Sequence, residues 1–178
     1  MSTYKYLFEK GEKIFGKERL FKTGFNISPM YRRSTARVKS VSKGLFHVEV
    51  RLKIGWKNRN YMNTIFGGSM FSAVDPIPMI QLTSILGGDY VVWDKSAEIV
   101  FKRPAREHLF ADFDFSQEEI DEIKNRVESE NEIVIIKTTN LMDKKREIVF
   151  CEVKKSIYIA NKQFYKNKLA LKKIHAKV

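Results

Sequence analysis

The sequence predicts an α+β fold in which an antiparallel β-sheet wraps one long, buried helix. Two observations lead to this fold class. First, residues 67–86 are apolar nearly all round and end at two glycines, as is typical of a helix in the middle of a domain. Second, two strand candidates precede this segment and four follow it. Together they predict one sheet of five or six strands packed on the helix.

Two elements are expected before the central segment. Residues 2–21 carry apolar side chains at mixed spacings of three and four, which indicates an amphipathic N-terminal helix. Residues 36–42 and 45–54 alternate polar and apolar side chains on either side of a turn that contains Gly44. This alternation predicts a β-hairpin.

The region after the central segment is expected to supply the rest of the sheet and one helix. Ser116 can cap the N-terminus of residues 117–130, where the first turn is acidic and Ile120, Ile123 and Val127 share one face. A polar turn suited to a hairpin joins the last two strands. The four strand candidates lie at residues 95–104, 108–116, 132–142 and 146–160.

Asp75 is the unusual residue of the central segment, because Pro76 follows it directly and Pro78 comes soon after. Two interpretations are open. Asp75 can be the N-cap of a helix that starts there, since proline is favoured in the first turn. Alternatively, the helix starts near Gly67, and the prolines remove N–H donors and bend it beside the carboxylate.

Composition favours one domain in a reducing compartment. The 178 residues are 43% hydrophobic, and no stretch approaches the roughly 18 consecutive apolar residues of a membrane span. The single cysteine, Cys151, excludes an intrachain disulfide and is expected to be a small buried side chain, while Trp56 and Trp93 are expected to pack. The histidines are scattered, so no metal site is expected.

These features predict a cytoplasmic protein with three parts. Residues 1–28 form an N-terminal helical segment, residues 29–160 form the α+β domain, and residues 161–178 form a basic C-terminal extension. The net charge of +12 implies an anionic partner. No nucleic-acid-binding motif accompanies the lysines, so a nucleic acid is not the expected partner. A membrane is not expected either, because no apolar stretch is long enough to span one.

A set of residues around the central segment resembles a known family. It is similar to the hot-dog fold thioesterases of the phenylacetyl-CoA thioesterase type, and most to an uncharacterised bacterial branch in which proline follows the aspartate. The resemblance covers about residues 30–160. Phe66 stands where the family has a histidine. The residues that carry the resemblance are Asn60, Thr64, Gly67, Gly68, Asp75, Arg103 and Pro104.

The resemblance implies a hot-dog fold and a catalytic role for three residues. Asp75 would act as general base or nucleophile on a thioester, the N–H of Gly68 would polarise its carbonyl, and Asn60 would orient the water. In such folds the two halves of a site come from two subunits, which implies a homodimer or, through further contacts, a tetramer. The implied substrate-binding residues are Thr64, Phe66, Gly67 and Arg103.

The resemblance leads to two functional hypotheses. In the first, the protein is a thioesterase that hydrolyses acyl-CoA or acyl groups on a carrier protein, with no cofactor. In the alternative, it is a non-catalytic acyl-CoA or lipid-binding protein, which the phenylalanine at position 66 would explain. The basic C-terminal extension is expected to be a solvated helix docked by one apolar stripe. Alternatively, its lysines contact the phosphates of coenzyme A or an acidic carrier protein.

Overall fold

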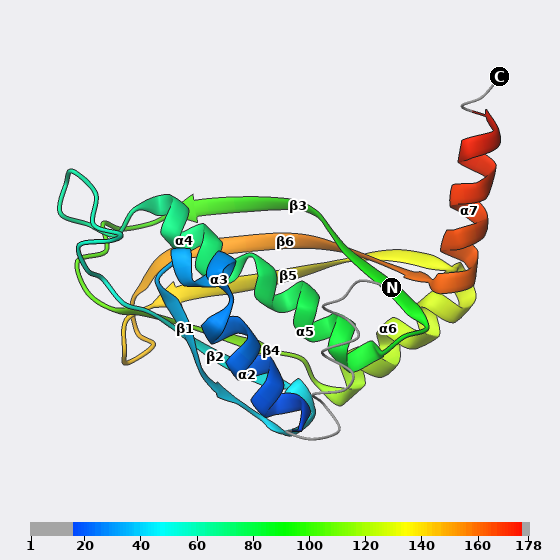
Figure 1. The fold of residues 1–178 in the computed structure, drawn as a ribbon, viewed down its shortest axis with the longest axis horizontal. Helices are drawn as coiled ribbons and strands as arrows, with labels where there is room; N and C mark the ends of the chain where they lie inside the picture. The colour runs from blue at the N-terminus through cyan, green and yellow to red at the C-terminus, as the bar shows by residue number, and fades with distance from the viewer. Residues whose placement is uncertain (1–15, 176–178) are drawn as a thin grey trace.

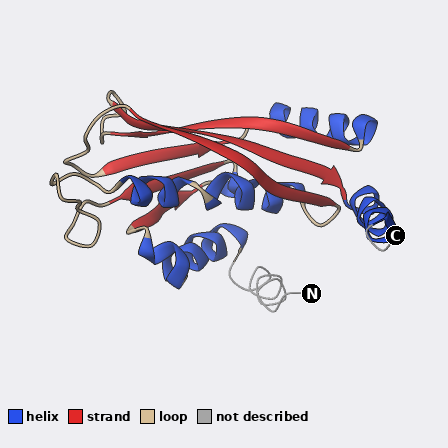
Figure 2. Cartoon of the chain, turned by 90° about the horizontal axis from the view of Figure 1, so that it is seen from above, coloured by secondary structure: helices blue, strands red, loops and turns tan. Residues whose placement is uncertain are grey.

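The computed structural model describes residues 16–175, so the helix expected within residues 2–21 lies mostly outside the described residues. The described part has the predicted α+β fold, in which one antiparallel sheet curves around a central helix (Figure 1). Figure 2 shows the central helix and the N-terminal helix on the same face of the sheet. The main core cluster joins the sheet to these helices.

The elements follow one another in the order expected from the sequence. The helices are α2 (Lys17–Ile27), α3 (Pro29–Arg33), the 3-10 turn η1 (Lys43–Leu45), α4 (Gly67–Val74), α5 (Pro76–Leu86), α6 (Gln117–Glu130) and α7 (Lys162–His175). The strands are β1 (Ala36–Val41), β2 (His47–Leu52), β3 (Tyr90–Phe101), β4 (Leu109–Asp114), β5 (Glu132–Met142) and β6 (Val149–Asn161).

The six strands form one sheet in the order β1-β2-β4-β5-β6-β3. Both predicted hairpins are confirmed, because β1 pairs antiparallel with β2, and β5 pairs antiparallel with β6. The predicted helix cap is also present, since the hydroxyl of Ser116 accepts a hydrogen bond from the N–H of Glu119 at 3.1 Å. β1 and β3 are the two edges of the sheet.

Edge strand β3 is longer than predicted. It begins at Tyr90 rather than at residue 95, and it pairs with β6 along its whole length except at an irregularity between Asp94 and Ser96. This irregularity is a β-bulge, which leaves one residue unpaired and bends the strand. The run of polar residues at the bulge looks like a strand boundary in the sequence, although the strand continues through it.

The central helix begins at Gly67, and this finding decides between the two interpretations of Asp75. Helix α4 ends just before Asp75, which has helical dihedral angles (φ −45, ψ −54), and α5 starts at Pro76. The N-cap interpretation is therefore wrong, and the predicted break beside the carboxylate is confirmed. Because Pro76 and Pro78 have no N–H, two carbonyls one turn earlier lose their intrahelical donors.

The N-terminal helices contribute side chains to the core, and neither tryptophan does. Phe21 of α2 is buried, and the hydroxyl of Tyr31 in α3 donates a hydrogen bond to the carbonyl of Ala73 in α4 at 2.9 Å. The expectation that the tryptophans pack is wrong, because Trp56 is 86% exposed and Trp93 is 56% exposed. Trp56 lies in the loop after β2, and Trp93 lies on edge strand β3.

Helix α7 stands away from the sheet at one end of the molecule (Figure 1). Its first turns are attached to the domain: Lys168 pairs with Glu132 of β5 at 2.5 Å, and its ammonium lies 5.9 Å from the ring centroid of Tyr158. Lys166 and Lys172 are exposed. The basic extension is therefore a helix anchored near its start, with lysines open to solvent.

Candidate active site

A buried lysine joins the break in the central helix to the sheet. The Nζ atom of Lys155 in β6 lies 2.8 Å from Oδ1 of Asp75, 2.5 Å from the backbone carbonyl oxygen of Asp75, and 2.6 Å from Oδ2 of Asp94 in β3. A lysine ammonium has three hydrogens to donate. All three are directed at oxygen atoms, so the hydrogen-bonding capacity of Lys155 is used completely.

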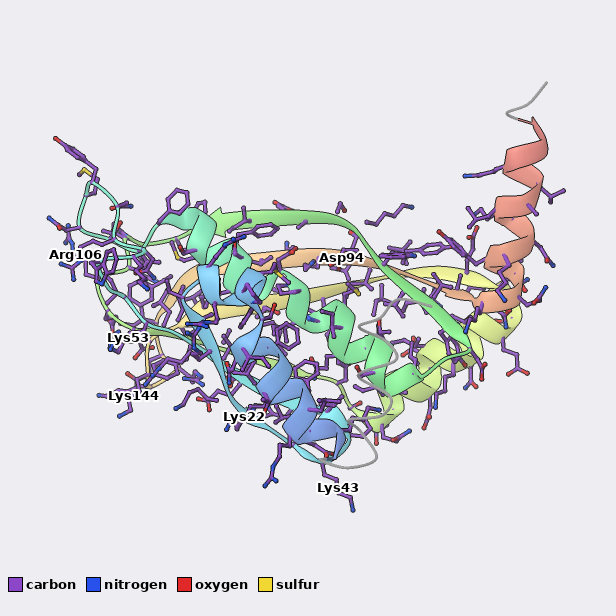
Figure 3. The ribbon with its side chains drawn as sticks, viewed as in Figure 1. Lys22, Lys43, Lys53, Asp94, Arg106 and Lys144 are labelled. Carbon is purple, nitrogen blue, oxygen red and sulfur yellow. The ribbon has the colours of Figure 1, made fainter. Side chains whose placement is uncertain are left out.

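The sheet explains how Lys155 reaches this position. Side chains along a strand alternate between the two faces of the sheet. In β6 the buried face carries Val153, Lys155, Ile157 and Ile159, and Lys155 is only 1% exposed. Asp94 lies on the neighbouring strand at the β-bulge, in the middle of the molecule (Figure 3). The lysine therefore occupies a core position and needs carboxylate partners there.

Asp75 and Asp94 differ in their surroundings. The side chain of Asp75 is 44% exposed, and that of Asp94 is 27% exposed. Burial raises the pKa of Asp94, although the hydrogen bond and the charge of Lys155 act in the opposite direction. The Oδ1 atom of Asp94 is buried and makes no hydrogen bond within the described part of the chain.

The N-terminus of α4 forms a second cluster. Phe66 precedes the helix, and its carbonyl accepts hydrogen bonds from the N–H groups of Ser69 and Met70. The N–H groups of Gly67 and Gly68 have no acceptor among the described residues, as is usual in the first turn of a helix. Such free N–H groups can bind a developing negative charge on oxygen.

Two phenylalanine rings lie against these glycines. A Cβ atom on Gly67 would lie 2.7 Å from Cζ of Phe101, and one on Gly68 would lie 2.8 Å from Cζ of Phe66. Glycine is therefore required at both positions while the rings stay where they are. Phe66 is 57% exposed and Phe101 is 54% exposed, so the free N–H groups are flanked by an open apolar surface.

The loop before α4 is held by Asn60 and Thr64. The Oδ1 atom of Asn60 accepts hydrogen bonds from the N–H groups of Met62 and Thr64, and its Nδ2 donates to the hydroxyl of Thr64 at 2.9 Å. The second hydrogen of Nδ2 has no acceptor within residues 16–175. Thr64 is buried at 7% exposure, which makes it part of the loop framework.

Arg103 follows β3 at the same end of α4. Its guanidinium donates a hydrogen bond to the carbonyl of Val149 at 2.8 Å, and the residue is exposed. The N–H of Ile65 donates to the carbonyl of Ala105 at 2.8 Å, which ties this turn to the residues in front of α4. The turn that carries Arg103 is therefore attached to the residues in front of α4, and the guanidinium itself lies at Val149.

The structure thus divides the predicted site residues between two places. One cluster lies at the N-terminus of α4, and the other is Asp75 at its C-terminal end. Gly68 and Asp75 are seven residues apart, which is about 10 Å along a helix. Within one chain, α4 therefore holds the two parts of the site apart. The residues of the cluster at the N-terminus of α4, called the glycine cluster here, are Asn60, Thr64, Phe66, Gly67, Gly68 and Arg103.

Sequence reasoning missed Lys155 and Asp94. A signal for Lys155 exists, because it lies at the same strand parity as Val153 and Ile157, where an apolar residue is expected. A lysine in a core position predicts a carboxylate partner, and Asp75 is the one acidic residue of the apolar central segment. Asp94 carries no comparable signal, because it lies just before residue 95, where the sequence pattern placed the start of the strand.

Three further features bear on what the protein can do: its cysteine, possible metal ligands and possible membrane-spanning helices. Cys151 is fully buried, as predicted, and burial raises the pKa of its thiol to about 11, so it stays protonated at neutral pH. No group of three or more histidine, cysteine, aspartate or glutamate side chains within residues 16–175 could hold a metal ion. None of the helices that the structure describes is both long and apolar enough to cross a membrane.

The sequence matches one protein family. This family is described as a domain of unknown function, DUF4442, and the match covers residues 17–159. It includes β1 to β6 almost entirely, both clusters of the candidate site, and α2. A search among curated proteins found no match.

Solved structures of thioesterase-superfamily proteins share the fold. PA5026 from Pseudomonas aeruginosa, described as a probable thioesterase, has a TM-score of 0.69 at 18% identity, over 80% of this chain and 94% of that one. Thioesterase HI1161 from Haemophilus influenzae has a TM-score of 0.58 at 9% identity, over 79% and 88% of the two chains. The PaaI protein of the E. coli phenylacetic acid degradation operon has a TM-score of 0.51 at 12% identity, over 76% and 86%. These similarities confirm the predicted hot-dog fold.

Proposed function

The chain belongs to the DUF4442 family, and from that premise and its hot-dog fold we propose that it hydrolyses acyl thioesters with Asp75 as the reacting carboxylate. The observation that supports this most is the arrangement around α4. One end of the helix offers free N–H groups that can polarise a carbonyl, and the other end offers a carboxylate that is open to solvent. The N–H groups can stabilise the negative oxygen that forms during thioester hydrolysis, and the carboxylate can act as the base or the nucleophile.

The reaction at Asp75 has two forms with the same products. As a general base, the carboxylate takes a proton from water while the water oxygen attacks the thioester carbon. The C–S bond then breaks, and the thiolate takes up the proton. As a nucleophile, the carboxylate attacks the carbon itself and expels the thiolate, and water cleaves the resulting anhydride. In both forms the negative oxygen of the tetrahedral intermediate accepts a hydrogen bond from the N–H of Gly68.

Asn60 has a supporting part in this proposal. Its Oδ1 and one hydrogen of Nδ2 hold the loop in front of α4, which fixes the approach to Gly68. Its second Nδ2 hydrogen remains to orient the water. Thr64 supports the same loop from its buried position.

Two chains are needed to bring the reacting groups together. The outer edge of β3 has no strand beside it in the described chain, and Trp93, Val100 and Phe101 on it are exposed. An open edge of this length calls for a covering partner. In our proposal the β3 strands of two chains pair antiparallel about a two-fold axis, so that Asp75 of one chain faces Gly68 of the other.

This pairing also gives α7 a function. Helix α7 starts beside the Tyr90 end of β3, because the N–H of Lys162 donates to the carbonyl of Asp89 at 2.9 Å. Antiparallel pairing places that end next to the Phe101 end of the partner strand, where Gly67 and Arg103 lie. The exposed lysines of α7 would then approach the phosphates of coenzyme A, or an acidic carrier protein, at the partner's glycine cluster.

The apolar rings at the glycine cluster favour an acyl group with an apolar body. Phe66 and Phe101 flank the free N–H groups, and neither ring carries a polar atom. The proposed substrates are therefore acyl-CoA or carrier-bound acyl thioesters. Phe66 stands where the hot-dog thioesterases that this sequence resembles have a histidine. A phenylalanine can only make apolar contacts, so the proposed reaction uses no acid or base at this position.

A panel of acyl-CoA thioesters of different chain length, scored for release of free thiol, tests the proposal. A chromogenic thiol reagent is suitable because the single cysteine, Cys151, is buried and gives little background. We expect release of coenzyme A from at least one member at a rate proportional to enzyme concentration. Binding of acyl-CoA without thiol release from any member would refute the proposed activity.

A further inference from the structure

We propose that Lys155 is the positioning residue of this site: its ammonium fixes the Asp75 carboxylate at the helix break and leaves one oxygen of it open for the reaction. The inference rests on the proposed function, because it concerns the residue that carries out the chemistry. It assigns a role to a buried cation that lies outside the central helix and outside the glycine cluster.

The geometry of the contact favours positioning over simple charge pairing. Lys155 binds both the backbone carbonyl oxygen and Oδ1 of Asp75, so it holds the main chain and the side chain of one residue together. A side chain that one cation ties to its own main chain has few rotamers left. This ordering lowers the entropic part of the activation free energy, because the carboxylate is already oriented for the reaction.

The contact leaves part of the carboxylate free. Lys155 uses Oδ1 of Asp75, whereas Oδ2 makes no hydrogen bond to a residue within 16–175. The side chain of Asp75 is 44% exposed, so water can reach it, but that of Lys155 is 2% exposed. The cation therefore approaches the carboxylate from the protein side and the substrate approaches from the other.

Asp94 completes the arrangement from the sheet. Its Oδ2 accepts a hydrogen bond from Nζ of Lys155 at 2.6 Å, and this bond holds the ammonium at the helix break. Without the cation, Asp75 and Asp94 would be two carboxylates with nothing between them, and like charges repel. Asp94 therefore positions Lys155, and Lys155 in turn positions Asp75.

Lys155→Met is the principal variant, because methionine keeps most of the length and the apolar stem but removes the ammonium. Lys154→Met is the matched control, since Lys154 is the neighbouring residue on the exposed face of the same strand. With the acyl-CoA that gives the highest kcat/KM, we expect Lys155→Met to lower kcat by about tenfold or more, as small misplacements do. KM should change by less than about threefold, and Lys154→Met should leave both constants unchanged.

A double-mutant cycle separates positioning from a general structural role. If Lys155 acts through Asp75, Lys155→Met should lower kcat in the natural protein but have no further effect in the Asp75→Asn background. Equal effects in both backgrounds would overturn the inference. A second outcome would also overturn the inference: the natural protein is active, Asp75→Asn is inactive, and Lys155→Met is fully active. In that case the proposed function would stand.

Loss of folding is handled by a second variant. Lys155→Met leaves Asp94 without its cation in a partly buried place, which can destabilise the fold. The Lys155→Met/Asp94→Asn protein removes this charge as well, and its folding is checked by circular dichroism and urea unfolding. We expect it to fold and to keep the low kcat. Recovery of full kcat in this protein would refute the positioning role, and a natural protein that hydrolyses no thioester would refute both the function and the inference.

Discussion

The ammonium of Lys155 lies 2.8 Å from the carboxylate of Asp75, so one buried cation on the sheet meets the one acidic residue of the apolar central segment. This relationship explains how a carboxylate is kept beside two prolines in the most apolar part of the chain. The prolines remove the N–H donors of two earlier carbonyls, whereas Lys155 on the sheet donates to the carbonyl of Asp75 itself. The position of Asp75 is therefore set from two sides.

Asp75→Asn is expected to abolish most of the hydrolysis without unfolding the protein. Asparagine keeps the shape and the oxygen that accepts from Lys155, but it cannot take a proton or attack a thioester. We expect kcat to fall by about a hundredfold or more, the scale of a positioned general base, with acyl-CoA affinity nearly intact. Asn60→Ala should reduce kcat less, because Asn60 holds the loop and the water and not the proton.

Asp121→Asn is the control for this experiment. Asp121 is an exposed aspartate on α6 that accepts a hydrogen bond from Gln117, away from the central helix. Its replacement should leave kcat unchanged. Hydrolysis that survives Asp75→Asn at the natural rate would remove Asp75 from the mechanism.

Asp94→Asn is expected to change how stability depends on pH. The pKa of Asp94 is raised above its ordinary value of 3.8 by burial, so the folded state holds this proton to higher pH than the unfolded state does. Where the folded state binds more protons, stability falls as pH rises. The free energy of unfolding of the natural protein, relative to that of the variant, should therefore decrease as pH rises above 3.8 and through the raised pKa.

Urea unfolding of both proteins between about pH 4 and about pH 7 measures this difference. Asparagine does not titrate, so subtraction of the two curves isolates the contribution of Asp94. A difference that increases with pH would mean that Lys155 outweighs burial and holds Asp94 in its charged form.

Gly68→Ala is expected to damage turnover while sparing stability. The new methyl group would displace the ring of Phe66, which is 57% exposed and has space on its solvent side. Alanine also favours helix over glycine by up to about 1 kcal/mol, so the free energy of unfolding should not fall. The displaced ring flanks the free N–H groups that the thioester carbonyl must approach, so kcat should drop by about tenfold or more.

Gly24→Ala is the matched control for the helix effect. A Cβ atom on Gly24 of α2 meets nothing within 4 Å. Both variants are compared by urea unfolding and by thiol release. Full activity in the Gly68→Ala protein would exclude close approach of a substrate to this backbone.

The edge of β3 predicts a homodimer at micromolar concentration. Lysines at Trp93 and Val100 would place like charges across a symmetric contact, so the Trp93→Lys/Val100→Lys protein should be a monomer in light scattering and should lose hydrolysis. Val134→Lys/Ile136→Lys changes two exposed apolar residues of an interior strand and should remain dimeric. A natural protein that is monomeric and active would exclude a site shared between subunits.

The lysines of α7 are expected to affect substrate binding but not the chemical step. In the Lys166→Ala/Lys172→Ala protein, KM for acyl-CoA should rise and kcat should stay constant, because these side chains contact a part of the substrate that does not react. Lys22→Ala/Lys43→Ala removes the same charge at a site far from α7 and should leave KM unchanged (Figure 3). A lower kcat with constant KM would contradict this role.

Local sequence patterns were sufficient for most of the fold. β5 spans residues 132–142 as predicted, because its ends are marked by a helix and a polar turn. The central helix was recognised by its length and composition, and the cap of α6 by Ser116. These features depend on neighbours in the chain, which is why one sequence is enough to find them.

The candidate site was predicted only where it depends on short spacing. Gly68 and Asp75 stand on one helix, and their separation can be read directly from the chain. Lys155 is 80 residues away from Asp75 in sequence, and the two meet because β6 lies beneath the helix break. The ion pair between Asp75 and Lys155 can therefore be recognised only in the tertiary structure.

The length of α4 has a consequence for how this family can vary. One residue more or less between Gly68 and Asp75 would turn the carboxylate by about 100° around the helix axis, since a helix has about 3.6 residues per turn. Asp75 would then point away from Lys155 and from any partner chain. Insertions and deletions should therefore be absent from α4 in active relatives.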